Sequence, residues 1–245
     1  MALPSVEDLL SAGSHFGHQT QRWNPKMKPY ILTEKNGIYV INLEKTNALL
    51  KAAGEAIHRI TAEGRTVLFV GTKVASRKVV EEAAGACNHF SVSNRWLGGM
   101  LTNFQTVRKS VKQIDKIEQM EKDGLFKAML KKEVLDLGRK KEQLMSIFGG
   151  IREMARLPGL VVVADLQHEH IAVAEARRLN IPIIGVCDTN VNPELVNYPI
   201  PANDDAVKSV KLILDYLAEQ AVPRSVGGDK DEASAVAAKF EGAEG

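Results

Sequence analysis

The stretch TVLFVGTK, residues 66–73, decides the fold class of this 245-residue chain. Its centre, VLFV, is an unbroken apolar run of strand length, and a glycine follows it directly. A strand that is apolar on both faces is typical of a parallel sheet covered by helices on both sides. The runs LVVVAD at 160–165 and PIIGVCD at 182–188 have the same character. These three runs therefore predict the buried centre of a parallel sheet.

Helical patterns alternate with these strands. Apolar residues recur at helical spacing in four segments, and Gly64 stands at the C′ position of the first helix. The segments cover residues 43–63, 74–87, 169–180 and 203–222, the last with Asn203 as its expected cap, and a short strand is expected at 89–94. This alternation predicts an α/β fold with a doubly wound, mostly parallel sheet flanked by helices.

Two local signals precede this domain. Ser5 is the expected N-cap of a short helix that runs through Leu10. Asn36-Gly37 lies between two short apolar runs, which predicts a β-hairpin. Between them, the stretch HFGHQTQRWNPKMKPY, residues 15–30, has neither helical nor strand periodicity, so we expect a loop there.

Residues 104–150 interrupt the alternation of strands and helices. Apolar residues stand three and four apart on two arms separated by Asp123-Gly124, which predicts an inserted antiparallel coiled-coil helical hairpin. Ile117 and Met120 are expected to drift off the seam of the pair. Residues 104–148 carry eleven Lys and Arg against seven acids, which suits either a binding surface or a solvated coiled-coil surface. The α/β domain then comprises residues 1–103 and 151–222, followed by a flexible acidic tail at 223–245.

Composition favours a soluble cytoplasmic protein. The formal net charge is only +2, so any basic face must be local. The two cysteines form no CxxC motif, and Cys187 is expected in the core. The chain opens without a basic leader, and no apolar run approaches the roughly 20 residues of a membrane span.

The loops that follow the strands are polar and should meet at one edge of the sheet, where a ligand site is expected in such folds. The segment VGTK lacks the glycine spacing of a phosphate-binding loop, so Gly71 is expected to permit a tight turn instead. HEH at 168–170 is not a zinc motif, and Glu169 is expected to be solvated at the start of a helix. An enzyme that binds a phosphorylated small molecule at this edge remains the alternative function.

A divalent metal ion such as zinc is predicted at the same edge. Doubly wound topology should bring Asp188, Asp204 and Asp205 close together, and His15 or His18 could reach them. One imidazole with carboxylates suits Zn²⁺ or a similar ion, so the predicted ligands are His18, Asp188, Asp204 and Asp205. Alternatively, Asp204 and Asp205 lie exposed in the first turn of the last helix and cap it. Two acids this close require either a cation or a raised pKa.

Basic and aromatic residues form the strongest signal for binding. Each of the two Trp residues follows an Arg, and the second pair precedes the flexible Gly98-Gly99. Cations suit phosphates, amides suit riboses and base edges, and exposed rings can stack on unpaired bases. Alternatively, the Trp rings pack at domain junctions while their Arg neighbours face RNA. The predicted RNA-binding residues are Arg22, Trp23, Lys26, Lys28, Lys73, Arg95, Trp96, Asn103, Arg108 and Lys109.

Several of these motifs together resemble the S-two family of bacterial small-subunit ribosomal proteins. They are HFGHQTQRWNPKMKPYI, VLFVGTK, NRWLGGMLTNFQTVRKS, IAVAEARRLNIPIIGVCDTN and YPIPANDDAVKSVKLIL, and the resemblance spans roughly residues 5 to 222. A coiled-coil hairpin inserted into an α/β domain is also the plan of that family. The family usually has a basic pair before Glu169, whereas this chain has Leu166, Gln167 and His168, so a phosphate contact there would depend on histidine protonation.

The resemblance implies a structural constituent of the small ribosomal subunit with no catalytic residues and no catalytic cofactor. It implies binding to small-subunit ribosomal RNA at the junction of head and body. It also implies contact with neighbouring ribosomal proteins, including docking of the mRNA-binding protein S-one. The expected location is the ribosome in the cytoplasm, with neither a membrane nor a small-molecule substrate as partner. A pure protein-interaction module with the hairpin as its arm is a third hypothesis.

Overall fold

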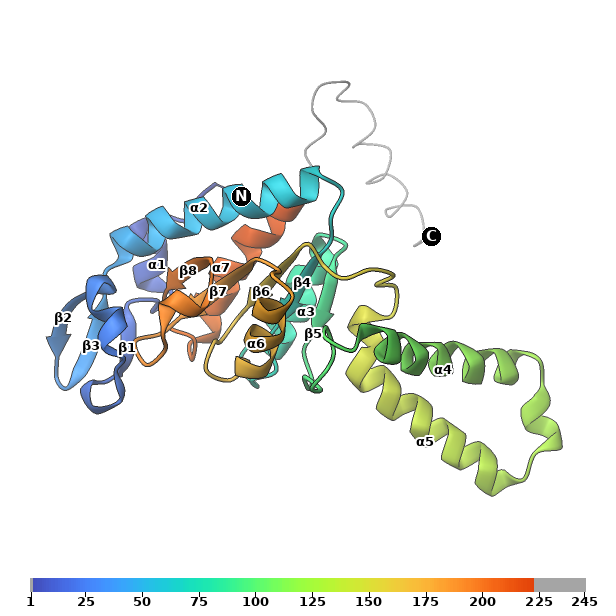
Figure 1. Cartoon of the computed structure of the whole chain (residues 1–245). Coiled ribbons are helices and arrows are strands. Elements are labelled where there is room, and N and C mark those ends of the chain that lie inside the picture. The colour runs from blue at the N-terminus through green and yellow to red at the C-terminus, as the bar shows by residue number, and fades with distance from the viewer. Residues whose placement is uncertain (1, 223–245) are drawn as a thin grey trace, which may run out of the picture.

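The computed structural model describes residues 2–222; the predicted acidic tail at 223–245 lies outside the described residues. A five-stranded sheet with strand order β5-β4-β6-β7-β8 forms its centre, and every neighbouring pair of strands is parallel (Figure 1). The strands are β4 (Val67–Val70), β5 (Phe90–Val92), β6 (Leu160–Val163), β7 (Ile183–Cys187) and β8 (Tyr198–Pro201). The parallel sheet predicted from the apolar runs is therefore confirmed.

Helices cover both faces of this sheet. One core contains Phe69 and Val162 together with α2 (Leu43–Ala62), α3 (Arg77–Ala86) and α7 (Val207–Ala221). The opposite core contains Leu68 and Val161 together with α6 (His170–Arg178). Successive residues of a strand point to opposite faces, so both cores draw on the same strands. The chain winds outward in both directions from the β4–β6 pair, as the doubly wound prediction requires.

The N-terminal segment forms a unit of its own beside the β8 edge. The elements here are α1 (Val6–Ser11), capped by Ser5, and an antiparallel sheet with strand order β1-β3-β2. Its strands are β1 (Phe16–Gln19), β2 (Ile31–Lys35) and β3 (Ile38–Ile41), with the 3₁₀ turns η1 (Thr20–Arg22) and η2 (Pro25–Tyr30) before β2. The hairpin at Asn36-Gly37 is confirmed, and both residues have positive φ. The expectation of a loop was wrong for β1, because pairing with β3 makes a strand of a segment without apolar alternation.

Two helices follow β5 and extend away from the sheet in Figure 1. They are α4 (Phe104–Lys122) and α5 (Lys131–Phe148), linked through η3 (Leu125–Ala128) and followed by η4 (Gly149–Ile151). Val111, Ile114 and Ile117 are buried on α4, whereas only Phe148 is buried on α5. The expectation that Ile117 leaves the seam was therefore wrong. Coiled-coil packing along the pair stays a prediction.

Three local expectations need correction. Strand β8 was not predicted because it contains Pro199 and Pro201, which are tolerated since β8 is an edge strand. Asn203 does not cap α7. Its side-chain oxygen accepts hydrogen bonds from the backbone N–H groups of Asp205 and Ala206, which precede the helix. Gly71 has no positive φ; a Cβ there would lie 2.7 Å from a methyl of Val80, so close helix packing requires this glycine.

Cys187 is fully buried, as expected. Among the described residues, no helix is both long and apolar enough to cross a membrane.

Replacing Gly17 with Ala should separate β1 from the large sheet. A Cβ at Gly17 would lie 2.5 Å from Cγ2 of Thr189 and 3.0 Å from the carbonyl oxygen of Tyr39. Overpacking of this kind costs about 1–3 kcal/mol, and we expect urea denaturation to show a loss of that size.

The matched control is Gly85→Ala on α3, where an added Cβ meets nothing within 4 Å. Alanine in an exposed helix stabilises by about 0.5–1 kcal/mol relative to glycine. Equal behaviour of the two variants would contradict the close approach of β1 to the sheet.

Candidate functional site at the carboxyl edge of the sheet

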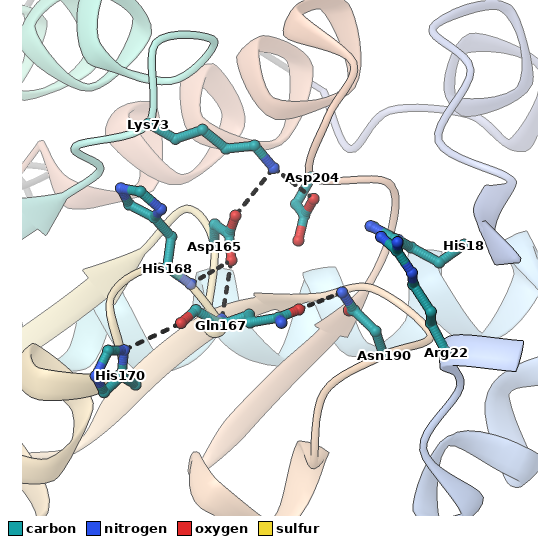
Figure 2. Close-up of a pocket in the computed structure, with 9 residues that line it drawn as sticks. All are labelled: His18, Arg22, Lys73, Asp165, Gln167, His168, His170, Asn190 and Asp204. Atoms are coloured by element: carbon teal, nitrogen blue, oxygen red, sulfur yellow. Dashed lines mark hydrogen bonds and ion pairs between the residues drawn. The ribbon is translucent and has the colours of Figure 1, made fainter.

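A cleft of about 720 Å³ opens at the carboxyl edge of the parallel sheet (Figure 2). Ligands of doubly wound proteins bind outside this edge, at the point where the strand order reverses. Here the reversal lies between β4 and β6. The residues that line the cleft are His18, Arg22, Lys73, Asp165, Gln167, His168, His170, Asn190 and Asp204. The N-terminal unit thus supplies one wall and the loops after four strands supply the rest.

Lys73, which follows β4, lies among three carboxylates. Its ammonium group is 3.0 Å from Asp165, 2.9 Å from Asp204 and 2.6 Å from Asp205. Burial alone would lower the pKa of Lys73, but the hydrogen bonds to Asp205, Asp204 and Asp165 outweigh it and raise the pKa above its ordinary value. The side chain is 25% exposed. The positive charge of Lys73 is therefore balanced by carboxylates of the protein itself, which argues against the predicted contact with phosphate.

Asp165 is positioned by its own loop. Its second carboxylate oxygen accepts hydrogen bonds from the backbone N–H groups of Gln167 and His168, each at 2.9 Å. The amide of Asn190 donates to the side-chain oxygen of Gln167 (Figure 2). The loops after β6 and β7 are thereby joined along the floor of the cleft.

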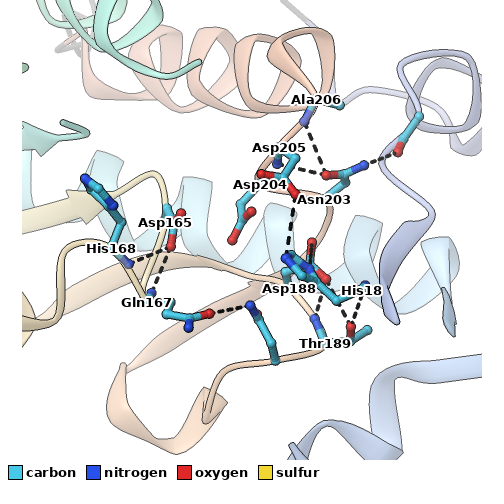
Figure 3. A network of polar contacts seen from close by, with 12 residues as sticks. His18, Asp165, Gln167, His168, Asp188, Thr189, Asn203, Asp204, Asp205 and Ala206 are labelled. Carbon is cyan, nitrogen blue, oxygen red and sulfur yellow. Dashed lines mark hydrogen bonds and ion pairs between the residues drawn. The ribbon is translucent and has the colours of Figure 1, made fainter. Parts of the chain in front are cut away.

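His18 connects the N-terminal unit to this edge. Its Nδ1 lies 3.1 Å from a carboxylate oxygen of Asp188, and its Nε2 lies 3.6 Å from Asp205 (Figure 3). Its backbone N–H donates to the hydroxyl of Thr189 at 2.8 Å. The hydrogen bond to Asp188 is the main reason that the pKa of His18 is raised, against the opposing effect of burial. Of the two alternatives, His15 and His18, it is His18 that reaches the acids, so the predicted position of His18 agrees with the geometry.

Three of the four predicted metal ligands come together. Each of His18, Asp188 and Asp204 offers a ligand atom, and these atoms lie within 4.8 Å of one another. Asp205 stands at the rim of this group, 60% exposed, between Lys73 and His18. The set of one imidazole and carboxylates is chemically suited to Zn²⁺, although the Lys73 ammonium already compensates part of the negative charge.

Asp204 does not behave as an exposed capping residue. Its side chain is only 2% exposed, and α7 begins after it, at Val207. Burial, followed by repulsion from Asp165 and Asp188, raises the pKa of Asp204 to about 7 despite the contact with Lys73. The alternative in which Asp204 and Asp205 cap α7 is therefore wrong, and the direction of the pKa of Asp204 agrees with one of the two outcomes expected for acids this close, a cation or a raised pKa.

A second cleft of about 350 Å³ adjoins the first. It is lined by Thr72, Arg77, Asn94, Arg95, Trp96, His168, Glu169 and Ile171. His168 lines both clefts, so they adjoin along the carboxyl edge, with Arg22 lining the first and Arg95 lining the second.

The predicted RNA-binding residues divide into two groups. Arg22, Lys26, Lys28, Arg95, Asn103 and Lys109 are exposed. Lys26 forms an ion pair with Glu194, whereas no carboxylate among the described residues pairs with the other four cations.

The remaining members are packed. Trp96 is 8% exposed and donates from Nε1 to Glu175 at 3.1 Å, so its ring is not available for stacking. Trp23 is half-buried, with its ring centroid 5.2 Å from that of Tyr39. Arg108 is half-buried and donates to the carbonyl oxygen of Arg152 at 2.9 Å. The reading in which the Trp rings pack while their Arg neighbours face outward fits this geometry.

Two buried carboxylates of the α6 segment were not predicted as site residues. Glu169 is 2% exposed and accepts hydrogen bonds from the backbone and hydroxyl of Thr72, so the expectation that it is solvated was wrong. Glu175 is also buried and accepts hydrogen bonds from the loop after β5. The only signal in the sequence that these two acids are buried was that each lies on a helix face with apolar neighbours. This signal could not reveal their hydrogen-bond partners, because those partners are distant in the chain.

The fold is that of an α/β protein whose ligand edge carries cations and acids but no recognised nucleophile motif. A family model described as Ribosomal protein S2 matches residues 9–223. Because this match spans most of the 245 residues, the chain belongs to the ribosomal protein S2 family. Proteins of this family are structural constituents of the small ribosomal subunit and take part in translation as part of a ribonucleoprotein. The resemblance seen in the sequence motifs is thereby confirmed.

Replacing Asp204 with Asn should stabilise the protein at pH 8 when divalent ions have been removed. Because the folded-state pKa of Asp204 is about 7 and its ordinary value is 3.8, the folded protein binds more protons than the unfolded chain between these values. Stability of the parent therefore falls as the pH rises from about 4 to about 7. Asn lacks this penalty, so its advantage in thermal denaturation should be largest at pH 8 and vanish near pH 4.

Other groups titrate in both proteins, so the difference in melting temperature between variant and parent at each pH isolates the effect of Asp204. A variant that melts below the parent at pH 8 would show that ionised Asp204 is favourable beside Lys73.

Proposed function

We propose that this protein binds small-subunit ribosomal RNA along the carboxyl edge of its parallel sheet, at the junction of head and body of the subunit. The observation that carries the proposal is the pair of adjoining clefts, each lined by an exposed arginine. Arg22 and Arg95 have no carboxylate partner among the described residues, so their charges are available to phosphates. Membership in the ribosomal protein S2 family supports the same partner.

Within this proposal the exposed cations contact phosphates. Arg22 and Lys28 act from the N-terminal unit, and Arg95 and Lys109 act from the loop after β5 and the start of α4. Asn103, exposed beside them, suits a ribose or a base edge. Lys26 can exchange its exposed partner Glu194 for a phosphate at little cost, because surface ion pairs contribute only about 0–1 kcal/mol.

The packed members of the predicted set act indirectly. Lys73, Trp96 and Arg108 hold the loops that present the exposed cations, through the contacts to carboxylates and a carbonyl described above. Trp23 can offer one edge of its ring, since it is half-buried against Tyr39.

The α4–α5 pair is proposed to be a coiled-coil arm that contacts RNA or neighbouring ribosomal proteins. Its charges are partly cross-linked: Arg152 pairs with Asp115 and Glu118, and Lys141 pairs with Glu118 and Glu121. These contacts fix the pair near its base and middle. Docking of the mRNA-binding protein S-one, which the family resemblance implies, is proposed to use the N-terminal unit, which lies at the opposite edge of the sheet from the arm.

A divalent ion, with zinc as the leading candidate, is proposed to join His18, Asp188 and Asp204. The supporting observation is that their ligand atoms lie within 4.8 Å of one another. His18 belongs to β1 and the two acids follow β7 and β8, so an ion there would tie the N-terminal unit to the large sheet. Asp205 completes the predicted ligand set from the rim.

Removing Arg22 and Arg95 together should reduce the salt dependence of RNA binding. Each lost phosphate contact lowers the slope of log K against log salt concentration by about 1, so the Arg22→Ala/Arg95→Ala double variant should lose about 2. Filter binding to a transcript of small-subunit ribosomal RNA over a range of salt concentrations would measure the slope.

A double variant with the same charge change, Lys51→Ala/Lys78→Ala, provides the control, because these exposed lysines lie on α2 and α3 away from the clefts. Its slope should match the parent. Affinity of the parent that does not depend on salt, or equal slopes in all three proteins, would rule out the proposed interface.

Zinc should raise the melting temperature of the parent but not of His18→Gln. Because a ligand that binds only the native state stabilises it, an excess of 100 times the dissociation constant contributes about 2.7 kcal/mol. Thermal denaturation with and without zinc at pH 7.5 would measure this, since metal ligands must be deprotonated.

His170→Gln is the control, since this imidazole lines the cleft but is not part of the proposed ligand set. If zinc shifts the melting temperature of both variants equally, the ion binds at another site.

A further inference from the structure

The carboxylate of Glu175 lies inside the loop that joins β5 to α4. Oε1 accepts hydrogen bonds from Nε1 of Trp96 at 3.1 Å and from the backbone N–H of Gly99 at 2.7 Å. Oε2 accepts three at 3.0 Å each, from the backbone N–H groups of Leu101 and Thr102 and from the hydroxyl of Thr102. One buried side chain thus organises donors from a loop more than 70 residues away in the chain.

All five partners are donors, so the loop is built around an anion. A carboxylate is acceptor-only when ionised, and hydrogen bonds to a charged acceptor are the strong ones. Burial alone would raise the pKa of Glu175, but the hydrogen bonds from the loop outweigh it and hold the pKa below its ordinary value. A glutamine of the same shape would turn its NH₂ group toward N–H donors. The site therefore requires the charge, not only the size, of glutamate.

This loop carries much of the proposed RNA interface. Arg95 is exposed next to the buried Trp96, and Asn103 is exposed at the last position before α4. The loop contains no helix or strand, and Gly99 has a φ of 93°, a conformation that other residues rarely adopt. Met100 and Leu101 anchor the loop in the core, but no other carboxylate among the described residues bonds to its backbone N–H groups.

We infer that Glu175 is a positioning residue for RNA binding: it holds the loop 94–103 in the single conformation that presents Arg95 and Asn103 to RNA. The inference rests on the proposed function. A loop ordered before binding loses less conformational entropy when the complex forms, so affinity rises without any new contact. Glu175 itself is buried behind the loop and does not touch the RNA. It also fixes the residues from which α4 begins, and so sets where the arm leaves the sheet.

The test compares Glu175→Gln with Thr61→Val in the full chain. Thr61 is a suitable control because it is a buried polar residue of α2 whose hydroxyl donates hydrogen bonds to backbone carbonyl oxygens of its own helix, and it lines neither cleft. We measure affinity for transcribed small-subunit ribosomal RNA across salt concentrations, and amide hydrogen exchange of the free proteins at Gly99, Leu101 and Thr102. Both are measured well below the melting temperature of each variant.

For Glu175→Gln we expect an affinity about tenfold lower at every salt concentration, with the slope against salt unchanged. Exchange at the three amides should accelerate. Thr61→Val, which loses buried hydrogen bonds away from the clefts, should leave both the affinity and the exchange at these amides nearly as in the parent. Glu175→Asp keeps an acceptor-only group and should recover part of the affinity, and it serves as the test variant if Glu175→Gln fails to fold.

Faster exchange in the loop with unchanged affinity would overturn the inference, as would equal losses of affinity in Glu175→Gln and Thr61→Val. A change in salt slope would show that phosphate contacts were lost, which also contradicts a purely positioning role. Failure of the proposed function is distinguishable, because the parent itself would then not bind the RNA.

Discussion

The contact of the Lys73 ammonium with Asp165, Asp204 and Asp205 is the interaction on which the ligand edge depends. It joins the ends of β4, β6 and β8, which are not all neighbours in the sheet. Buried ions are costly unless they are paired and hydrogen-bonded, so removal of the lysine would leave two buried acids without compensation. Through Asp205 and Asp188 the same cluster reaches His18, and thereby holds the N-terminal unit against the sheet.

Buried charges and exposed charges have different roles at this edge. The buried carboxylates accept hydrogen bonds from loops: Asp165 from its own turn, Glu169 from Thr72 and Glu175 from the loop after β5. The exposed cations Arg22 and Arg95 are left without carboxylate partners within the described residues. Acids therefore fix the shape of an edge on which Arg22 and Arg95 are exposed. A chain with a net charge of only +2 can in this way leave single cations unpaired at one place.

The arm and the sheet are coupled through the base of the arm. Arg108 donates to the carbonyl oxygen of Arg152, which itself pairs with two acids of α4. On the other side, Glu175 orders the loop that leads into α4. Both attachments lie where the chain leaves the sheet and returns to it. A change in the loop after β5 would consequently alter the direction of the arm as well as the edge that we propose binds RNA.

The sequence by itself determined the elements of this protein whose signals are local. Continuous apolar runs specified β4, β6 and β7, Asn36-Gly37 specified the hairpin, and helical spacing specified the helices, including the inserted pair. Family motifs in the sequence also pointed to the correct family. Strands β1 and β8 were not predicted from the sequence. Their extended conformation comes from pairing with a neighbouring strand, not from apolar alternation or from residues that favour strands.

Only the tertiary structure decided which charges are available. In the sequence Lys73 looks as suited to phosphate as Arg22, and Glu169 was expected to be solvated at the start of a helix. The strand order brings Lys73 to three acids and brings Glu175 to five donors, across separations of about 70 to 130 residues. Long-range pairing depends on topology and on the depth of burial, and neither has a counterpart in local residue spacing. For this reason the fold could be predicted element by element, while the roles of the charged residues could not.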